Sequence, residues 1–150
     1  MKRRDLLKTG GAAMVLSAGG GQMAFAQDAT IEIPDMMMGA DDAPIEIIEY
    51  ASFTCPHCAR FHADVWPQLK ADYVETGKVR FIFREVYFDR FGLWASMIAR
   101  CGGEGRFFAF ADLIYKEQRT WGASGDPAVV IEELRKLAKT AGMNDETLDA

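Results

Sequence analysis

The alternation of hydrophobic and polar residues predicts a strand, a helix and a second strand in the middle of the chain. Residues 45–50, IEIIEY, are rich in β-formers and apolar apart from two glutamates, which predicts a buried strand. A helix can begin directly afterwards, with Cys55 as its N-cap and Pro56 as its first residue. Residues 79–86, VRFIFREV, predict the second strand. This order predicts a βαβ unit over 45–86, whose two strands are parallel.

The helix of this unit carries an apolar residue at every fourth position. Gly77 is placed to end the helix, and Pro67 lies inside it, where it should cause a kink. The predicted buried stripe consists of Phe61, Val65, Leu69 and Tyr73.

The remainder of the chain, 87–150, is predicted to be helical. The segment 27–44 is predicted to be an irregular lead-in. Its three consecutive methionines, Met36-Met37-Met38, are better explained by packing or a loop than by copper binding. Gly102-Gly103 separates two helices, and Asp126-Pro127 caps a third. Asn144 resembles one more N-cap. The first two helices present two apolar faces: Leu93, Trp94, Met97, Ile98 and Cys101 on one, and Phe107, Phe108, Phe110, Ala111, Ile114 and Tyr115 on the other.

Residues 1–26 have the features of a signal peptide. A basic start, Lys2-Arg3-Arg4, precedes a mildly apolar stretch and the small-x-small sequence Ala24-Phe25-Ala26. The pair Arg3-Arg4 favours the twin-arginine route, and the general secretory route is the alternative. We therefore expect export to the periplasm of a Gram-negative cell. We expect no membrane insertion after signal cleavage, because no run reaches the roughly 18 apolar residues of a spanning helix.

Length and charge narrow the function classes further. The 150 residues, 49% hydrophobic and 26% charged, suit one globular domain. Of the 17 basic and 22 acidic residues, 13 and 21 follow the signal, a net charge of −8. Nucleic acid and anionic lipid need a basic surface, so we expect neither as a partner.

The sequence FTCPHCARFH, residues 53–62, carries the candidate chemistry. Haem attachment would need a histidine where Ala59 stands. A zinc site could combine Cys55, Cys58 and His62, and Cys101 could join them, but there is no second matched cysteine pair. Inert core thiols are disfavoured at the exposed start of a helix. A redox disulfide remains the leading interpretation, and it needs no cofactor.

The redox interpretation has a physical mechanism. Cys55 would face the free N–H groups and the positive dipole end of the helix, both of which stabilise a thiolate. His57 could stabilise it further, and Cys58, one turn into the helix, could close the disulfide and resolve mixed disulfides. A stabilised thiolate favours the reduced pair, which makes the disulfide a stronger oxidant.

Residues 47–58, IIEYASFTCPHC, followed by Phe61, resemble the DsbA family of periplasmic thiol:disulfide oxidoreductases, and the resemblance extends over roughly 38–150. It implies a thioredoxin fold with a helical insertion. By the family motif, Cys55 is the nucleophile, Cys58 is the resolving thiol and Pro56-His57 sets the redox poise. Glu49 would be a buried acid that exchanges a proton with Cys58, against the alternative of an exposed strand residue.

The same resemblance implies elements that this sequence lacks. Family members continue into further strands and a cis-proline loop, but no Thr-Pro or Val-Pro follows residue 58. We therefore expect an incomplete thioredoxin-like α/β fold, with the helical insertion over 87–150 cut short. Cys101 is expected to be a buried thiol that has lost a structural disulfide partner.

These observations predict an exported protein-disulfide oxidoreductase. Its substrates would be unfolded or reduced exported proteins, and a membrane-bound redox partner would reoxidise it. The alternatives are a metal- or thiol-binding module on the same scaffold, and a fragment without activity.

Overall fold

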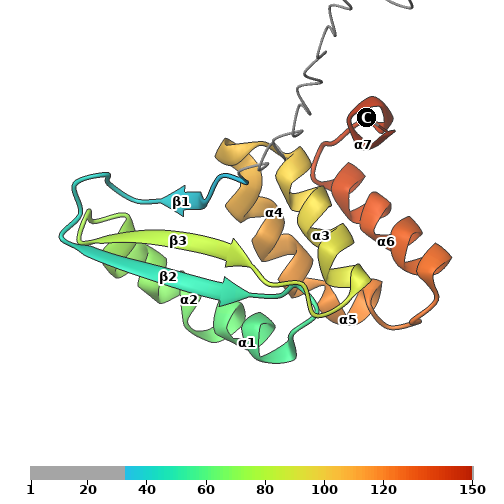
Figure 1. Ribbon diagram of the computed structural model, residues 1–150, viewed down its shortest axis with the longest axis horizontal. Helices are drawn as coiled ribbons and strands as arrows, with labels where there is room; N and C mark the ends of the chain where they lie inside the picture. Colours follow the sequence, from blue (N-terminus) through green and yellow to red (C-terminus); the bar gives the residue numbers. More distant parts are fainter. Residues whose placement is uncertain (1–32, 150) are drawn as a thin grey trace, which may run out of the picture. The chain divides into compact units, whose positions relative to one another are not determined.

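The computed structural model describes residues 33–149. The predicted signal segment, 1–26, and the first residues of the lead-in lie outside the described residues. The elements, labelled in Figure 1, are β1 (Met36–Met38), β2 (Ile45–Ala51), α1 (Pro56–Asp64), α2 (Trp66–Leu69), the π-helical turn η1 (Lys70–Val74), β3 (Val79–Glu85), α3 (Arg90–Cys101), α4 (Glu104–Lys116), α5 (Gln118–Trp121), α6 (Pro127–Thr140) and α7 (Asp145–Asp149).

The strands form one mixed sheet in the order β1-β3-β2. β2 and β3 are parallel, with Ile47 opposite Phe81, which confirms the predicted βαβ unit. β1 runs antiparallel to β3, with Met36 opposite Phe83. The prediction of an irregular lead-in was therefore wrong at β1. The alternation of this short strand buries Met36 and exposes its successor, a two-residue period too short to read from three identical residues.

The prediction that β2 is buried was also wrong. Ile45, Ile48 and Tyr50 are 53%, 38% and 63% exposed. β2 is an edge strand of the described sheet, and only one of its faces is covered by helices. The residues on its covered side are Ile47, Glu49 and Ala51.

The helix after β2 is interrupted next to Pro67, as predicted, and continues as α2 and η1. Its buried side chains are His62, Trp66 and Val74. The predicted stripe is wrong at Val65 and Tyr73, which are about half exposed. The break at the proline and the π-helical turn change the helical phase, so a regular four-residue spacing misplaces the inward face.

α3 differs from its prediction as well. Its buried residues are small: Gly92, Ala95, Ser96 and Ala99. Small side chains let α3 approach α4 closely, whereas a large residue there would hold the helices apart. Cys101, the last residue of α3, is exposed, so the expectation of a buried thiol was wrong.

The remaining helices follow the sequence closely. All six apolar residues predicted for α4 are buried. Asp126 caps α6, accepting the amide of Ala128 at 2.8 Å, and Asn144 accepts the amide of Thr147 at 2.9 Å. α5 was not predicted. Its Trp121 is buried and donates from Nε1 to the carbonyl of Ile114 at 2.8 Å, which ties α5 to α4.

An aromatic core joins the sheet to the helices. Phe81 of β3 contacts Trp66 of α2, with ring centroids 4.3 Å apart, and Phe83 lies 5.4 Å from Phe107 of α4. α1, α2 and α4 thus cover one face of the sheet (Figure 1). This packing places the start of α1 at the carboxyl end of β2, next to α4 and α5.

The opposite face of the sheet is more open. Met37, Ile82 and Ile48 form a row across the three strands, and Met37 and Ile48 are exposed. Beside this row, Arg84 forms a two-pronged ion pair with Asp35 at 2.7 and 2.8 Å and donates to Tyr50 Oη at 2.9 Å. This face therefore carries both apolar and charged side chains.

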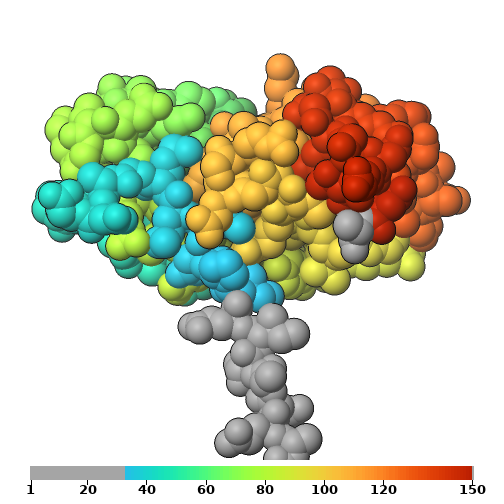
Figure 2. All heavy atoms as spheres, turned by 90° about the horizontal axis from the view of Figure 1, so that it is seen from above, coloured from blue at the N-terminus to red at the C-terminus, as the bar shows by residue number. Residues whose placement is uncertain are grey.

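The C-terminal helices pack on α3 rather than on the sheet. Figure 2 shows α6 and α7, in red, beside the yellow α3. A bidentate pair between Arg100 and Glu85, 2.6 Å at each contact, fastens α3 to β3. Among residues 33–149, no helix has the length and apolar character needed to cross a membrane.

Candidate active site

The two cysteines of the CPHC sequence lie where β2 passes into α1. Cys55 is the N-cap of α1, with extended backbone angles of φ −79° and ψ 118°, and Pro56 is the first helical residue, as predicted. The Cys55 amide donates to the Ser52 carbonyl at 3.0 Å, and its carbonyl accepts the Ala59 amide at 3.1 Å. Both cysteines are free thiols and partly buried. This geometry leaves the first amides of α1 directed at the Cys55 sulfur.

The two thiols are in different electrostatic environments. Burial opposes ionisation of Cys55, but hydrogen bonds from the Cys58 thiol and from the backbone amides of Cys58 and His57 lower the pKa of Cys55 below its ordinary value. Free amides at a helix N-terminus are the donors that a thiolate needs. Cys55 is therefore the thiol that ionises first.

Cys58 is shifted the other way. Its burial, its hydrogen bond to Cys55 and the negative charges of Cys55 and Glu49 raise the pKa of Cys58 to about 11. At neutral pH this side chain is a thiol, and a proton must arrive whenever it is released as a thiolate. The pair therefore combines an accessible nucleophile, Cys55, with a second cysteine, Cys58, which takes up a proton when it is released.

His57 contributes through its backbone rather than through its ring. Its Nδ1 lies 2.6 Å from Nη2 of Arg60, and because a guanidinium only donates, Nδ1 is the acceptor. The ring of His57 is exposed and turned to Arg60, whereas its amide is directed at Cys55. The thiolate stabilisation expected from the imidazole is supplied here by the main chain.

Glu49 lies beneath the cysteines on the covered face of β2. Its side chain is 13% exposed, and Oε2 is 3.1 Å from Nε2 of His62. The alternative of an exposed strand residue is therefore wrong. The charge of Glu49 acts on Cys58, as the pKa of that thiol indicates. The carboxylate is thus near enough for its charge to act on the thiol that needs a proton.

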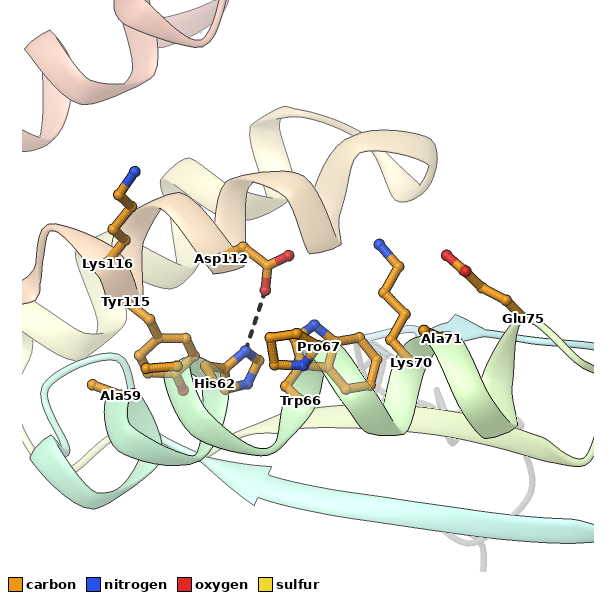
Figure 3. A pocket seen from close by; sticks show the side chains of 11 residues that line it. Ala59, His62, Trp66, Pro67, Lys70, Ala71, Glu75, Asp112, Tyr115 and Lys116 are labelled. Atoms are coloured by element: carbon orange, nitrogen blue, oxygen red, sulfur yellow. Dashed lines mark hydrogen bonds and ion pairs between the residues drawn. The ribbon is translucent and has the colours of Figure 1, made fainter.

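His62 is a residue of this site that sequence reasoning missed. Its side chain is 2% exposed and bridges two carboxylates, with Nδ1 3.3 Å from Oδ1 of Asp112 on α4 (Figure 3). Its ring stacks on Tyr115 with a centroid distance of 4.2 Å. Burial opposes its charge, but the hydrogen bonds and negative charges of Asp112 and Glu49 raise the pKa of His62 above its ordinary range. A usable signal is its position four residues after Cys58, which puts both on one helix face.

The loop that carries Cys55 is held by polar contacts from two elements. The Gln118 amide of α5 donates to the carbonyls of Phe53 and Cys55 at 2.7 and 3.0 Å. On the other side, Thr54 Oγ1 donates to Asp89 Oδ2 at 2.6 Å, and Asp89 Oδ1 caps α3. The cysteine loop is therefore clamped between the start of α3 and α5.

The positions of the side chains also show how the site relates to metal binding and where Cys101 lies. Over residues 33–149, no group of three or more histidine, cysteine or acidic side chains is arranged to hold a metal ion. Both ring nitrogens of His62 are engaged by carboxylates rather than directed at the thiols. Cys101 lines a separate apolar groove of about 170 Å³ with Met97 and Ile131, and does not contribute to the site.

Comparisons with known proteins agree with this arrangement. The family described as thioredoxin matches residues 32–150. The "Putative protein-disulfide oxidoreductase" of Rickettsia bellii is 37% identical over 108 residues, which are 71% of this chain and 42% of that protein. "Disulfide bond formation protein D" of Bacillus subtilis is 36% identical over 52 residues, which are 35% of this chain and 23% of its own length.

A solved structure extends the comparison to three dimensions. Wolbachia pipientis alpha-DsbA1 superimposes with a TM-score of 0.70 and 31% sequence identity, covering 79% of this chain and 59% of its own. This chain therefore spans less than two thirds of the length of each of these three relatives. The family match, the thiol pair at the start of α1 and the helices after β3 lead to one conclusion: the chain belongs to the thioredoxin family and is DsbA-like.

Proposed function

We propose that this protein is a periplasmic protein-disulfide oxidoreductase that forms disulfides in exported proteins through Cys55 and Cys58. The observation that carries the proposal is the opposite displacement of the two thiol pKa values, downward at Cys55 and up to about 11 at Cys58. A thiolate that is easily formed is both a good leaving group and a stabilised reduced product. The pair therefore favours accepting electrons from substrate thiols.

The reaction follows from this asymmetry. A substrate thiolate attacks the Cys55 sulfur of the Cys55–Cys58 disulfide, and Cys58 leaves with the bonding electrons and takes up a proton. A second substrate thiolate then attacks the substrate sulfur of the mixed disulfide, and Cys55 leaves as a thiolate. Two substrate thiols become a disulfide, and the two electrons reside on the reduced Cys55–Cys58 pair.

Each further part of the proposal has its own support. The relatives are named for protein-disulfide chemistry, which favours unfolded or reduced exported proteins as substrates. The reduced pair must return its electrons to an oxidant, for which we propose a membrane-bound redox partner. The basic N-terminal segment and its small-x-small site favour export to the periplasm.

Two measurements test the activity. The full chain in its oxidised form should convert a reduced dithiol peptide to its disulfide, and Cys55→Ser and Cys58→Ser should each abolish turnover. Equilibration with glutathione should give a reduction potential well above the value for thioredoxin, which is about −270 mV. A potential at or below that value would show a reductant and refute the oxidase assignment.

Location is tested separately. A fusion of residues 1–26 to a reporter that is active only outside the cytoplasm should be exported, and Lys-Lys in place of Arg3-Arg4 should block a twin-arginine route. Retention of the wild-type fusion in the cytoplasm would contradict the periplasmic part of the proposal without touching the chemistry.

A further inference from the structure

The buried charge cluster behind the cysteines has more members than the thiol chemistry described above uses. His62 of α1 bridges Glu49 of β2 and Asp112 of α4, so three elements meet on one imidazole. The two ends differ in exposure, at 13% for the Glu49 side chain and 42% for that of Asp112, and His62 between them is almost fully enclosed. The cluster therefore runs from the sheet beneath Cys58 toward solvent.

A cavity lies at the outer end of this line. It has a volume of about 560 Å³ and lies between α1, α2 and α4 (Figure 3). His62 and Asp112 line it, and so do the exposed residues Ala63, Pro67 and Lys116, so the cavity opens to bulk water. Its volume is far above the roughly 30 Å³ that one water molecule occupies. Water in the cavity can thus reach the Asp112 side of His62.

The orientation of the imidazole gives the line a direction. Nε2 faces Glu49 and Nδ1 faces Asp112, so the two nitrogens hydrogen-bond to different carboxylates. With both nitrogens protonated, the ring can release its Nε2 proton toward Glu49 and keep its Nδ1 proton toward Asp112. Stacking on Tyr115 and the surrounding core fix the ring in this position. An imidazole that is fixed in place with each nitrogen facing a carboxylate is better suited to proton transfer than to packing alone.

We propose that His62 is a positioning residue for the thiol chemistry, which holds Glu49 in place and supplies the proton that Glu49 relays to Cys58, while Asp112 pairs with the other ring nitrogen at the edge of the cavity. The inference rests on the proposed oxidoreductase function and deepens it. When Cys58 leaves the disulfide as a thiolate, His62 releases its Nε2 proton, the Glu49 carboxylate relays that proton to the thiolate, and Nδ1 keeps its own. A proton from water then restores the imidazolium. One proton enters from solvent for each thiolate that becomes a thiol.

The charged and titratable groups around His62 are few, so its titration can be assigned. Its own helix contributes Cys58, β2 contributes Glu49, and α4 contributes Asp112. The remaining groups that stack on the ring or line the cavity are Tyr115, Lys116, Lys70 and Glu75.

The test compares His62→Gln and Asp112→Asn with the control Asp64→Asn, an exposed acid on the same helix that removes one negative charge elsewhere. Glutamine keeps a donor for Glu49 but cannot titrate. Loss of the imidazolium leaves the Glu49 charge uncompensated beside Cys58, so NMR of the reduced protein should show the pKa of Cys58 moving further up. Asp112→Asn should lower the pKa of His62, and Asp64→Asn should leave both values unchanged.

Kinetics provide the second measurement. Removing a general acid costs at least about 100-fold, and because Glu49 itself remains, we expect His62→Gln to lose on the order of tenfold in exchange rate. The loss should grow with pH. At low pH hydronium can supply the proton that His62 no longer provides, whereas at higher pH it is too scarce to do so. Asp112→Asn should show the same pH trend with a smaller loss, and it changes a half-exposed side chain that the fold tolerates.

The outcomes separate the two proposals. A folded His62→Gln protein with an unchanged pKa of Cys58 and an unchanged pH profile would overturn the role of His62. Absence of exchange in the wild type, with the coupling between His62 and Cys58 still visible by NMR, would overturn the oxidoreductase function and leave the placement of His62 intact.

Discussion

The contact between Gln118 and the cysteine loop leads to a prediction that can be worked out from its geometry. One side-chain amide donates to two main-chain carbonyls, of Phe53 at 2.7 Å and of Cys55 at 3.0 Å. A net hydrogen bond contributes about 0.5–1.5 kcal/mol, so the pair contributes about 1–3 kcal/mol. Replacing the amide with a carboxylate, in Gln118→Glu, removes both donors and adds repulsion against two carbonyl oxygens. We expect the unfolding free energy at pH 7 to fall by at least this amount.

The pH dependence of this variant has a definite sign. The two carbonyls disfavour the charged form, so the pKa of the introduced carboxyl should be raised above its unfolded value of about 4.3. The stability difference from wild type should therefore be smallest below pH 4 and grow as pH rises through the raised pKa. Below pH 4 the carboxyl can donate one hydrogen bond again.

Urea unfolding followed by tryptophan fluorescence measures this difference. Gln68→Glu is the matched control, because Gln68 is exposed on α2. It should change the unfolding free energy by less than about 0.5 kcal/mol at any pH between 3 and 8. Equal stabilities of Gln118→Glu and Gln68→Glu at pH 7 would refute the clamp.

Three further predictions concern the thiol and the contacts around it. Alkylation of Cys55 in a Cys58→Ala protein should reach half its maximal rate below the ordinary pH of about 8.5, because the backbone donors remain; a midpoint at or above it would contradict thiolate stabilisation. Arg100→Met should lower the unfolding free energy by about 3 kcal/mol, because it strands Glu85, whose side chain is 3% exposed. Adding Glu85→Met should restore most of the loss, and no recovery in urea unfolding would refute the pairing argument. Gly92→Ala should cost about 1–3 kcal/mol in thermal unfolding, because its Cβ would lie 2.9 Å from Ser52 Oγ; wild-type stability would show that the hydroxyl moves aside freely.

Local signals predicted the centre of the fold well. Pro56 and Gly77 bound the helical segment after β2, and the apolar run of β3 has no competing interpretation, so the parallel unit followed directly. Asp126 and Asn144 were equally readable, because a capping side chain hydrogen-bonds within three residues of itself. Such features could be predicted because they depend only on residues that are close to one another in the sequence.

The errors have tertiary causes. Leu93 and Met97 were assigned to the inside of α3, but close approach to α4 selects Ala95 and Ala99 instead. Large apolar residues are the usual markers of a buried face, and a helix pair that packs through small residues reverses the rule. Val65 was misplaced because the helix is broken beside it.

The residues of the candidate site also divide into those predicted from local sequence and those that depend on tertiary contacts. The two cysteines and Glu49 were identified from the motif, and the structure brings Glu49 beneath Cys58 as that motif implies. His62 was considered as a zinc ligand and was otherwise taken as a packing or solvent-facing residue, as a single histidine in a helix ordinarily is. Its importance depends on Asp112, fifty residues away, and no local pattern links the two.

These separations also imply how the site is assembled during folding. Cys55, Cys58, Glu49 and His62 lie within 14 positions of one another in the sequence, whereas Gln118 reaches back 63 residues to the Cys55 carbonyl. Closing so long a loop is entropically costly and is offset only when α4 docks on the sheet. Undocking of α4 and α5 would release the Gln118 clamp and the Asp112 contact in one step. The lifetime of the assembled thiol site is thus set by the local stability of two helices that carry neither cysteine.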